Sequence, residues 1–124
     1  RKRGLWDAKL FDFAELYGAE FGMDKANRLR FSQTMMTHAM LFTGVDVVDG
    51  VPRRWRVENS WGAKESGKEG FYTMNDSWYD EHMFEIAAPT DYLTEKMKKG
   101  LDTSPVVLPA WDPMGSLAKD EAAL

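Results

Sequence analysis

The sequence predicts an α+β domain in which short helices accompany an antiparallel, barrel-like sheet. Short apolar or alternating stretches are separated by turn residues, and the Asp49-Gly50 pair is typical of a tight β-hairpin. At 124 residues with 44% hydrophobic side chains, the chain can bury one core but is too short for two ordinary domains. We therefore predict a single domain over residues 1–124.

The N-terminal segment is rich in aromatic side chains. Residues 4–21 mix these rings with acidic residues at spacings that match neither a helix nor a strand, so we predict a mostly extended segment. Asp24 then precedes a short helical pattern and is a plausible N-cap, which predicts a short helix over residues 25–29.

A hairpin is predicted in the middle of the chain. Residues 35–45 are apolar and β-prone, with too few polar interruptions for a half-exposed strand, so we predict a strand buried on both faces. Residues 46–52 contain Asp49-Gly50 and predict the turn. A turn at this point pairs residues whose numbers sum to about 98, which places His38 opposite residues 57–62.

The returning strand alternates in polarity. Over residues 53–59, arginine and glutamate side chains share one face, while Trp55, Val57 and Asn59 share the other. Asn59 is therefore predicted among buried side chains, where its amide must find hydrogen-bond partners.

The remaining residues predict further short elements. Residues 62–70 predict a polar loop, 71–74 a third strand, 75–82 one helical turn and 83–88 a fourth strand. Residues 90–100 predict a helix opened by Thr90 and ended by Gly100, 105–111 an extended stretch, 112–115 a turn and 116–124 a tail.

Composition excludes several function classes. The net charge is −4 with both signs interspersed, so no charge pattern indicates a nucleic-acid partner. No apolar run approaches the roughly 20 residues that cross a bilayer, so we expect a soluble protein without membrane contact. His38 and His82 are the two histidines and cysteine is absent, so we expect neither a metal site nor a cofactor.

His38 and Asn59 form a candidate site. If the two strands pair as predicted, the amide oxygen of Asn59 can accept from one ring nitrogen of His38 and leave the other as a base toward a thiol or hydroxyl. On the pattern alone, the alternative is favoured, in which His38 is a satisfied core histidine and Asn59 a strand-end cap.

Four motifs favour the first alternative. The motifs are Met23-Asp24-Lys25-Ala26 with Arg28-Leu29, Met36-Thr37-His38-Ala39-Met40, Val57-Glu58-Asn59-Ser60-Trp61-Gly62 and Leu108-Pro109-Ala110-Trp111-Asp112-Pro113-Met114-Gly115. With these motifs the chain resembles the C-terminal half of a papain-like cysteine peptidase, of the bleomycin hydrolase and aminopeptidase C branch.

The resemblance implies a cysteine-type aminopeptidase that cleaves peptides from a free N-terminus. It makes His38 the general base, Asn59 the residue that orients it, and Trp61 the shield of their contact. The nucleophilic cysteine and an oxyanion-hole glutamine belong to the family's N-terminal, helix-rich half. We therefore expect the chain to begin inside a longer one and to be inactive alone. The alternative is a non-catalytic papain-like domain used for assembly or binding.

The resemblance also implies a cytoplasmic hexamer and a C-terminal arm, from about residue 111, that lies in the cleft. The arm's terminal carboxylate would hold the amino group of the substrate. Because the tail continues past the usual end of the family, that carboxylate is assigned either to Ala118, after trimming, or to Leu124.

The aromatic content predicts an exposed apolar face toward a partner, either the missing half or another copy. The rings too numerous for one small core are Trp6, Phe11, Phe13, Tyr17, Phe21, Trp55, Trp61, Trp78, Tyr79 and Trp111.

Overall fold

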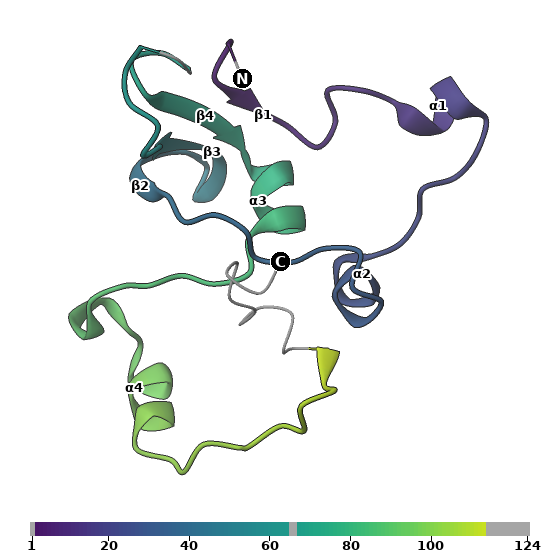
Figure 1. Cartoon of the computed structure of the whole chain (residues 1–124). Coiled ribbons are helices and arrows are strands. Elements are labelled where there is room, and N and C mark those ends of the chain that lie inside the picture. The colour runs from purple at the N-terminus through teal and green to yellow at the C-terminus, as the bar shows by residue number, and fades with distance from the viewer. Residues whose placement is uncertain (1, 65–66, 114–124) are drawn as a thin grey trace.

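A four-stranded sheet forms the centre of the computed structural model, which describes residues 2–64 and 67–113 (Figure 1). The strand order is β1-β4-β3-β2. The β1 strand runs parallel to β4, whereas the other neighbours are antiparallel. The strands are β1 (Leu5–Trp6), β2 (Leu41–Val48), β3 (Val51–Glu58) and β4 (Phe71–Asn75).

The α+β class is confirmed, but two details of the sheet prediction are wrong. The sheet is mixed, because the N-terminal strand β1 enters beside β4 in the same direction. It is also open, with β1 and β2 at its edges among the described residues, so it does not close into a barrel.

Short helices connect and flank the strands. Asp12, Asp24 and Thr94 each accept a hydrogen bond from a first-turn backbone N–H, as N-cap residues do. The helices are α1 (Phe13–Tyr17), α2 (Lys25–Arg30), α3 (Asp76–His82), the 3₁₀ helix η1 (Thr90–Tyr92) and α4 (Glu95–Leu101).

The predicted Asp24 cap is confirmed, while α1 lies inside the segment that the sequence predicted as extended. Its signal was present: Asp12 with Glu15 three residues on is the acidic form of a capping pattern, and Gly18 follows the last turn.

The hairpin prediction is confirmed. Val48 pairs with Val51 across Asp49 and Gly50, whose φ angles of 53° and 78° are those of a two-residue primed turn. At the other end Leu41 pairs with Glu58. The pairing therefore follows the predicted register closely.

The predicted strand over residues 35–45 is wrong in its limits and in its burial. The strand begins at Leu41, so His38 precedes it, and it continues to Val48. Most of its side chains are exposed. The reason is its place in the sheet: β2 is an edge strand with a neighbour on one side only.

The C-terminal predictions need three corrections. Residues 83–88 form no strand, because the chain leaves the sheet after α3 and β1 occupies the place beside β4. The predicted helix from Thr90 is divided into η1 and α4. Gly100 lies inside α4, which ends at Leu101. Of the predicted turn and tail, residues 114–124 lie outside the described residues.

The core lies on one face of β3 and β4. Val57, Tyr72 and Met74 are almost fully buried there, and Trp6 stacks on the Tyr72 ring at 4.4 Å between centroids. Trp55 packs beside them and donates from Nε1 to Asp76 at the start of α3. The alternation predicted for residues 53–59 is therefore confirmed, since Val57 and Asn59 are buried whereas Arg56 and Glu58 are exposed.

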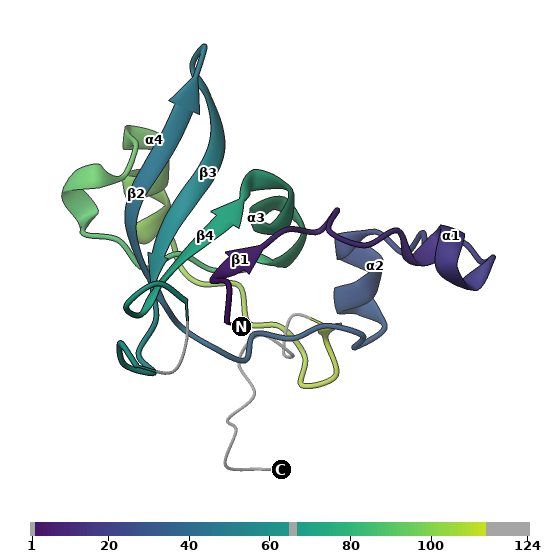
Figure 2. The ribbon, with the colours of Figure 1, turned by 90° about the horizontal axis from the view of Figure 1, so that it is seen from above.

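Many large apolar side chains remain exposed, as predicted. Both views show α1 projecting away from the sheet (Figures 1 and 2). The α1 region carries a chain of ring contacts through Phe11, Phe13, Tyr17 and Phe21. Within the described part of the chain, no helix has the length and apolar character needed to cross a membrane.

Candidate active site

The predicted contact between His38 and Asn59 is present. His38 lies in the segment just before β2, and Asn59 directly follows β3, so the paired strands bring the two residues together. His38 Nε2 lies 2.9 Å from Asn59 Oδ1. Because an amide oxygen only accepts, the ring donates from Nε2, which leaves the Nδ1 lone pair of the neutral imidazole available as a base.

Asn59 is the one strongly buried polar side chain among the described residues, with 6% of its surface exposed. Its backbone N–H donates to the carbonyl oxygen of Gly70 at 3.0 Å. Its side-chain Nδ2 is buried and has no acceptor among the described residues. The amide is therefore held by its backbone and by its contact with His38.

Trp61 covers one side of this contact. Its ring stacks on the His38 imidazole, with centroids 5.0 Å apart and planes inclined by 29°. The Trp61 side chain is itself 44% exposed. The ring therefore covers one side of the imidazole, while His38 stays exposed to solvent on another side.

The sequence contains no cysteine, so the chain holds the His38–Asn59 pair but no thiol. Ala118 and Leu124, the two candidates for the substrate-binding carboxylate, lie outside the described residues. Gly70 was given no role in the site from the sequence. Its signal was the Glu69-Gly70 pair before an apolar strand, a pattern typical of a tight turn.

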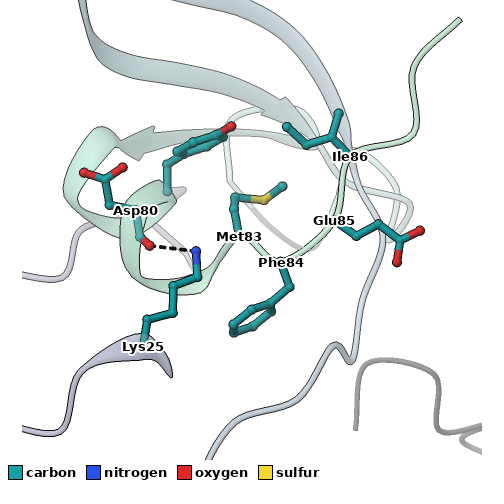
Figure 3. A pocket seen from close by; sticks show the side chains of 7 residues that line it. Lys25, Asp80, Met83, Phe84, Glu85 and Ile86 are labelled. Carbon is teal, nitrogen blue, oxygen red and sulfur yellow. Dashed lines mark hydrogen bonds between the residues drawn. The ribbon is translucent and has the colours of Figure 1, made fainter. Parts of the chain in front are cut away.

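A separate cavity of about 230 Å³ lies beside α3, away from the three site residues (Figure 3). Lys25 reaches across from α2 and donates from Nζ to the backbone oxygen of Asp80 at 2.8 Å. Met83, Phe84 and Ile86 contribute its apolar lining. Lys25 thus ties α2 to α3 at this cavity.

His82, at the end of α3, packs against Trp78 with the ring centroids 4.1 Å apart and the planes tilted by 40°. Burial lowers the pKa of His82 below its ordinary value of 6.5, and the positive charge of Arg28 lowers it further. The negative charge of Glu81 raises the pKa of His82, and the positive charge of Lys25 lowers it.

We predict that the His82 ring signals titrate below pH 6.5 in an NMR titration. As pH falls below about 6.5, the unfolded chain binds more protons at His82 than the folded chain does. The contribution of His82 to stability is therefore complete above about pH 6.5 and is lost as pH falls through the lowered folded-state pKa. His82→Gln should remove this part of the pH dependence. A titration midpoint at or above 6.5 would contradict the prediction.

With this geometry established, the chain can be compared with known proteins. The model of the Peptidase C1-like family matches residues 1–115. This chain belongs to that family. The match covers most of the chain, including β1 to β4 and all three site residues.

Relatives of this Peptidase C1-like chain include aminopeptidase C of Lactobacillus helveticus, 43% identical over 121 residues, and human bleomycin hydrolase, 43% identical over 122 residues. Each alignment covers 95% of this chain and 27% of the relative. The crystal structure of PepW from Lactobacillus rhamnosis HN001 matches with a TM-score of 0.81 and 40% identity, over 94% of this chain and 27% of that chain. The chain thus spans about a quarter of the length of these relatives.

Proposed function

We propose that this chain supplies the His38 and Asn59 half of a cysteine aminopeptidase active site, and that the nucleophilic thiol comes from a segment beyond these 124 residues. The observation that carries the proposal is the 2.9 Å contact between His38 Nε2 and Asn59 Oδ1, beneath the Trp61 ring, in a chain of the Peptidase C1-like family.

The proposed reaction uses the free nitrogen of His38. Nδ1 takes the proton of the incoming cysteine thiol, which gives a thiolate and an imidazolium. The thiolate attacks the peptide carbonyl, and the imidazolium returns its proton to the leaving amine as the C–N bond breaks. Water then hydrolyses the acyl-enzyme. Asn59 Oδ1 accepts from Nε2 throughout, so the ring keeps its orientation while Nδ1 gains and loses the proton.

Specificity for a free N-terminus is proposed from the names of the aminopeptidase C relatives. In this proposal the carboxylate of the C-terminal arm, at Ala118 or Leu124, binds the amino group of the substrate and fixes its distance from the thiolate. Assembly as a hexamer and a cytoplasmic location belong to the same proposal. The exposed rings along α1 support a contact with another protein surface.

We predict that the purified 124-residue chain does not hydrolyse amino-acid amides or short peptides, because His38 has no thiol to activate. The polypeptide produced from the longer reading frame upstream of Arg1 should hydrolyse them and should be blocked by iodoacetamide. Release of the amine product from a chromogenic amino-acid amide measures both.

Two results would contradict the proposal. The first is turnover by the 124-residue chain itself, blocked by an active-site reagent. The second is an upstream reading frame without a cysteine, which would instead support a non-catalytic papain-like domain used for assembly or binding.

A further inference from the structure

Gly70 accepts the hydrogen bond from the backbone N–H of Asn59. Glu58 and Phe71 are the last paired residues of β3 and β4, and the bond from Asn59 N–H to Gly70 O continues the ladder by one residue. Since Nδ2 of Asn59 has no acceptor within residues 2–64 and 67–113, no second side-chain bond from these residues fixes the amide. The position of Oδ1 beneath His38 therefore depends on this backbone bond.

A tight turn aims the Gly70 carbonyl. Lys68 and Phe71 exchange two backbone hydrogen bonds of 2.9 and 3.0 Å around Glu69 and Gly70. Both central residues have positive φ, 55° for Glu69 and 88° for Gly70, as in a type I′ turn. The second central position of such a turn favours glycine, because a Cβ is strained at positive φ.

At Gly70 the backbone conformation, and not the space around it, restricts which residue can be placed there. A Cβ at Gly70 would meet Gly62 O at 3.5 Å, which is ordinary van der Waals contact. An L-residue would instead have to leave the left-handed region or bear its strain, and leaving it would rotate the carbonyl away from Asn59.

We propose that Gly70 is a positioning residue for His38. By holding the turn that presents its carbonyl to Asn59 N–H, it sets the place of Asn59 Oδ1 and, through the hydrogen bond from His38 Nε2–H, the orientation of the imidazole. The proposal rests on the proposed function only for its consequence on catalysis.

The chain offers a matched control in Gly50. It occupies the same second position of a primed turn, after Asp49, with a φ of 78°, and a Cβ there would meet nothing within 4 Å. It lies at the far end of the β2–β3 hairpin, so its turn holds neither Asn59 nor His38. Gly50→Ala therefore introduces a comparable backbone strain without touching the site.

The test follows the His38 Nε2–H proton by ¹⁵N-edited NMR in the 124-residue chain, where its hydrogen bond to Asn59 Oδ1 should slow its exchange with solvent. Gly70→Ala is expected to lose this protected Nε2–H signal, whereas Gly50→Ala should keep it. Retention in both variants, or loss in both, would overturn the proposal. If Gly70→Ala does not fold, Gly70→Asn serves instead, because asparagine adopts positive φ more readily than alanine. This variant is expected to fold and to keep the protected His38 Nε2–H signal. A folded Gly70→Asn chain that loses it would also overturn the proposal.

The catalytic consequence is measured separately in the cysteine-bearing polypeptide. There Gly70→Ala should lower kcat by about tenfold to a hundredfold with little change in KM, because a displaced base affects the chemical step more than substrate binding. An unchanged kcat in a protein that has lost the His38 Nε2–H signal would contradict the proposed role of His38 while leaving the positioning by Gly70 intact. If neither kcat nor the Nε2–H signal changes, the positioning itself is overturned.

Discussion

Replacing His38 by alanine in the cysteine-bearing polypeptide should lower kcat/KM for amino-acid amides by about 10²–10⁴-fold, the usual contribution of a positioned general base. Alanine removes the nitrogen that takes the thiol proton and the imidazolium that protonates the leaving amine. Within the described part of the chain, it also leaves Asn59, 6% exposed, with neither Oδ1 nor Nδ2 hydrogen-bonded. Steady-state kinetics on a chromogenic amide measure the loss.

The matched control is His82→Ala, because His82 is the other histidine of the chain and lies on α3, outside the His38–Asn59 contact. It should keep kcat/KM within about threefold of the parent value, given that positions away from the reacting groups alter the chemical step little. Equal losses in the two variants would mean that histidine substitution acts through folding. A fully active His38→Ala protein would remove His38 from the mechanism.

Met74→Ala should lower the free energy of unfolding by about 2–5 kcal/mol, the cost of deleting a buried methionine side chain. Met74 is 2% exposed and shares a core of three strongly buried residues with Val57 and Tyr72. Because total stabilities of domains are about 5–15 kcal/mol, the loss would be severe.

Urea unfolding followed by tryptophan fluorescence measures this change. Val47→Ala is the control, since Val47 lies on the edge strand β2 and is 49% exposed, so its truncation opens no cavity. It should shift the unfolding free energy by less than about 0.5 kcal/mol, as surface changes do. Similar losses in both variants would show that the exposed side of β2 is covered in solution.

The sequence by itself determined the hairpin and the chemistry at its open end. Asp49-Gly50 fixed the turn, because both residues tolerate the positive φ of a primed turn, and the turn fixed the register. The register then placed His38 and Asn59 together, and their side chains meet at 2.9 Å. Such local signals need no knowledge of the rest of the fold, and the motifs around them identified the family.

Only the tertiary structure decided which strands became neighbours and which became edges. Residues 83–88 have the composition of a strand, yet Leu5 and Trp6 take the place beside β4, because Trp6 can stack on the buried Tyr72 there. The apolar residues of β2 were predicted to be buried on both faces, yet β2 is an edge strand. Burial and pairing depend on partners distant in sequence, which no local pattern encodes. The hydrogen bond from Asn59 N–H to the Gly70 carbonyl likewise depends on tertiary structure, because it joins two strand ends that meet only in the folded sheet.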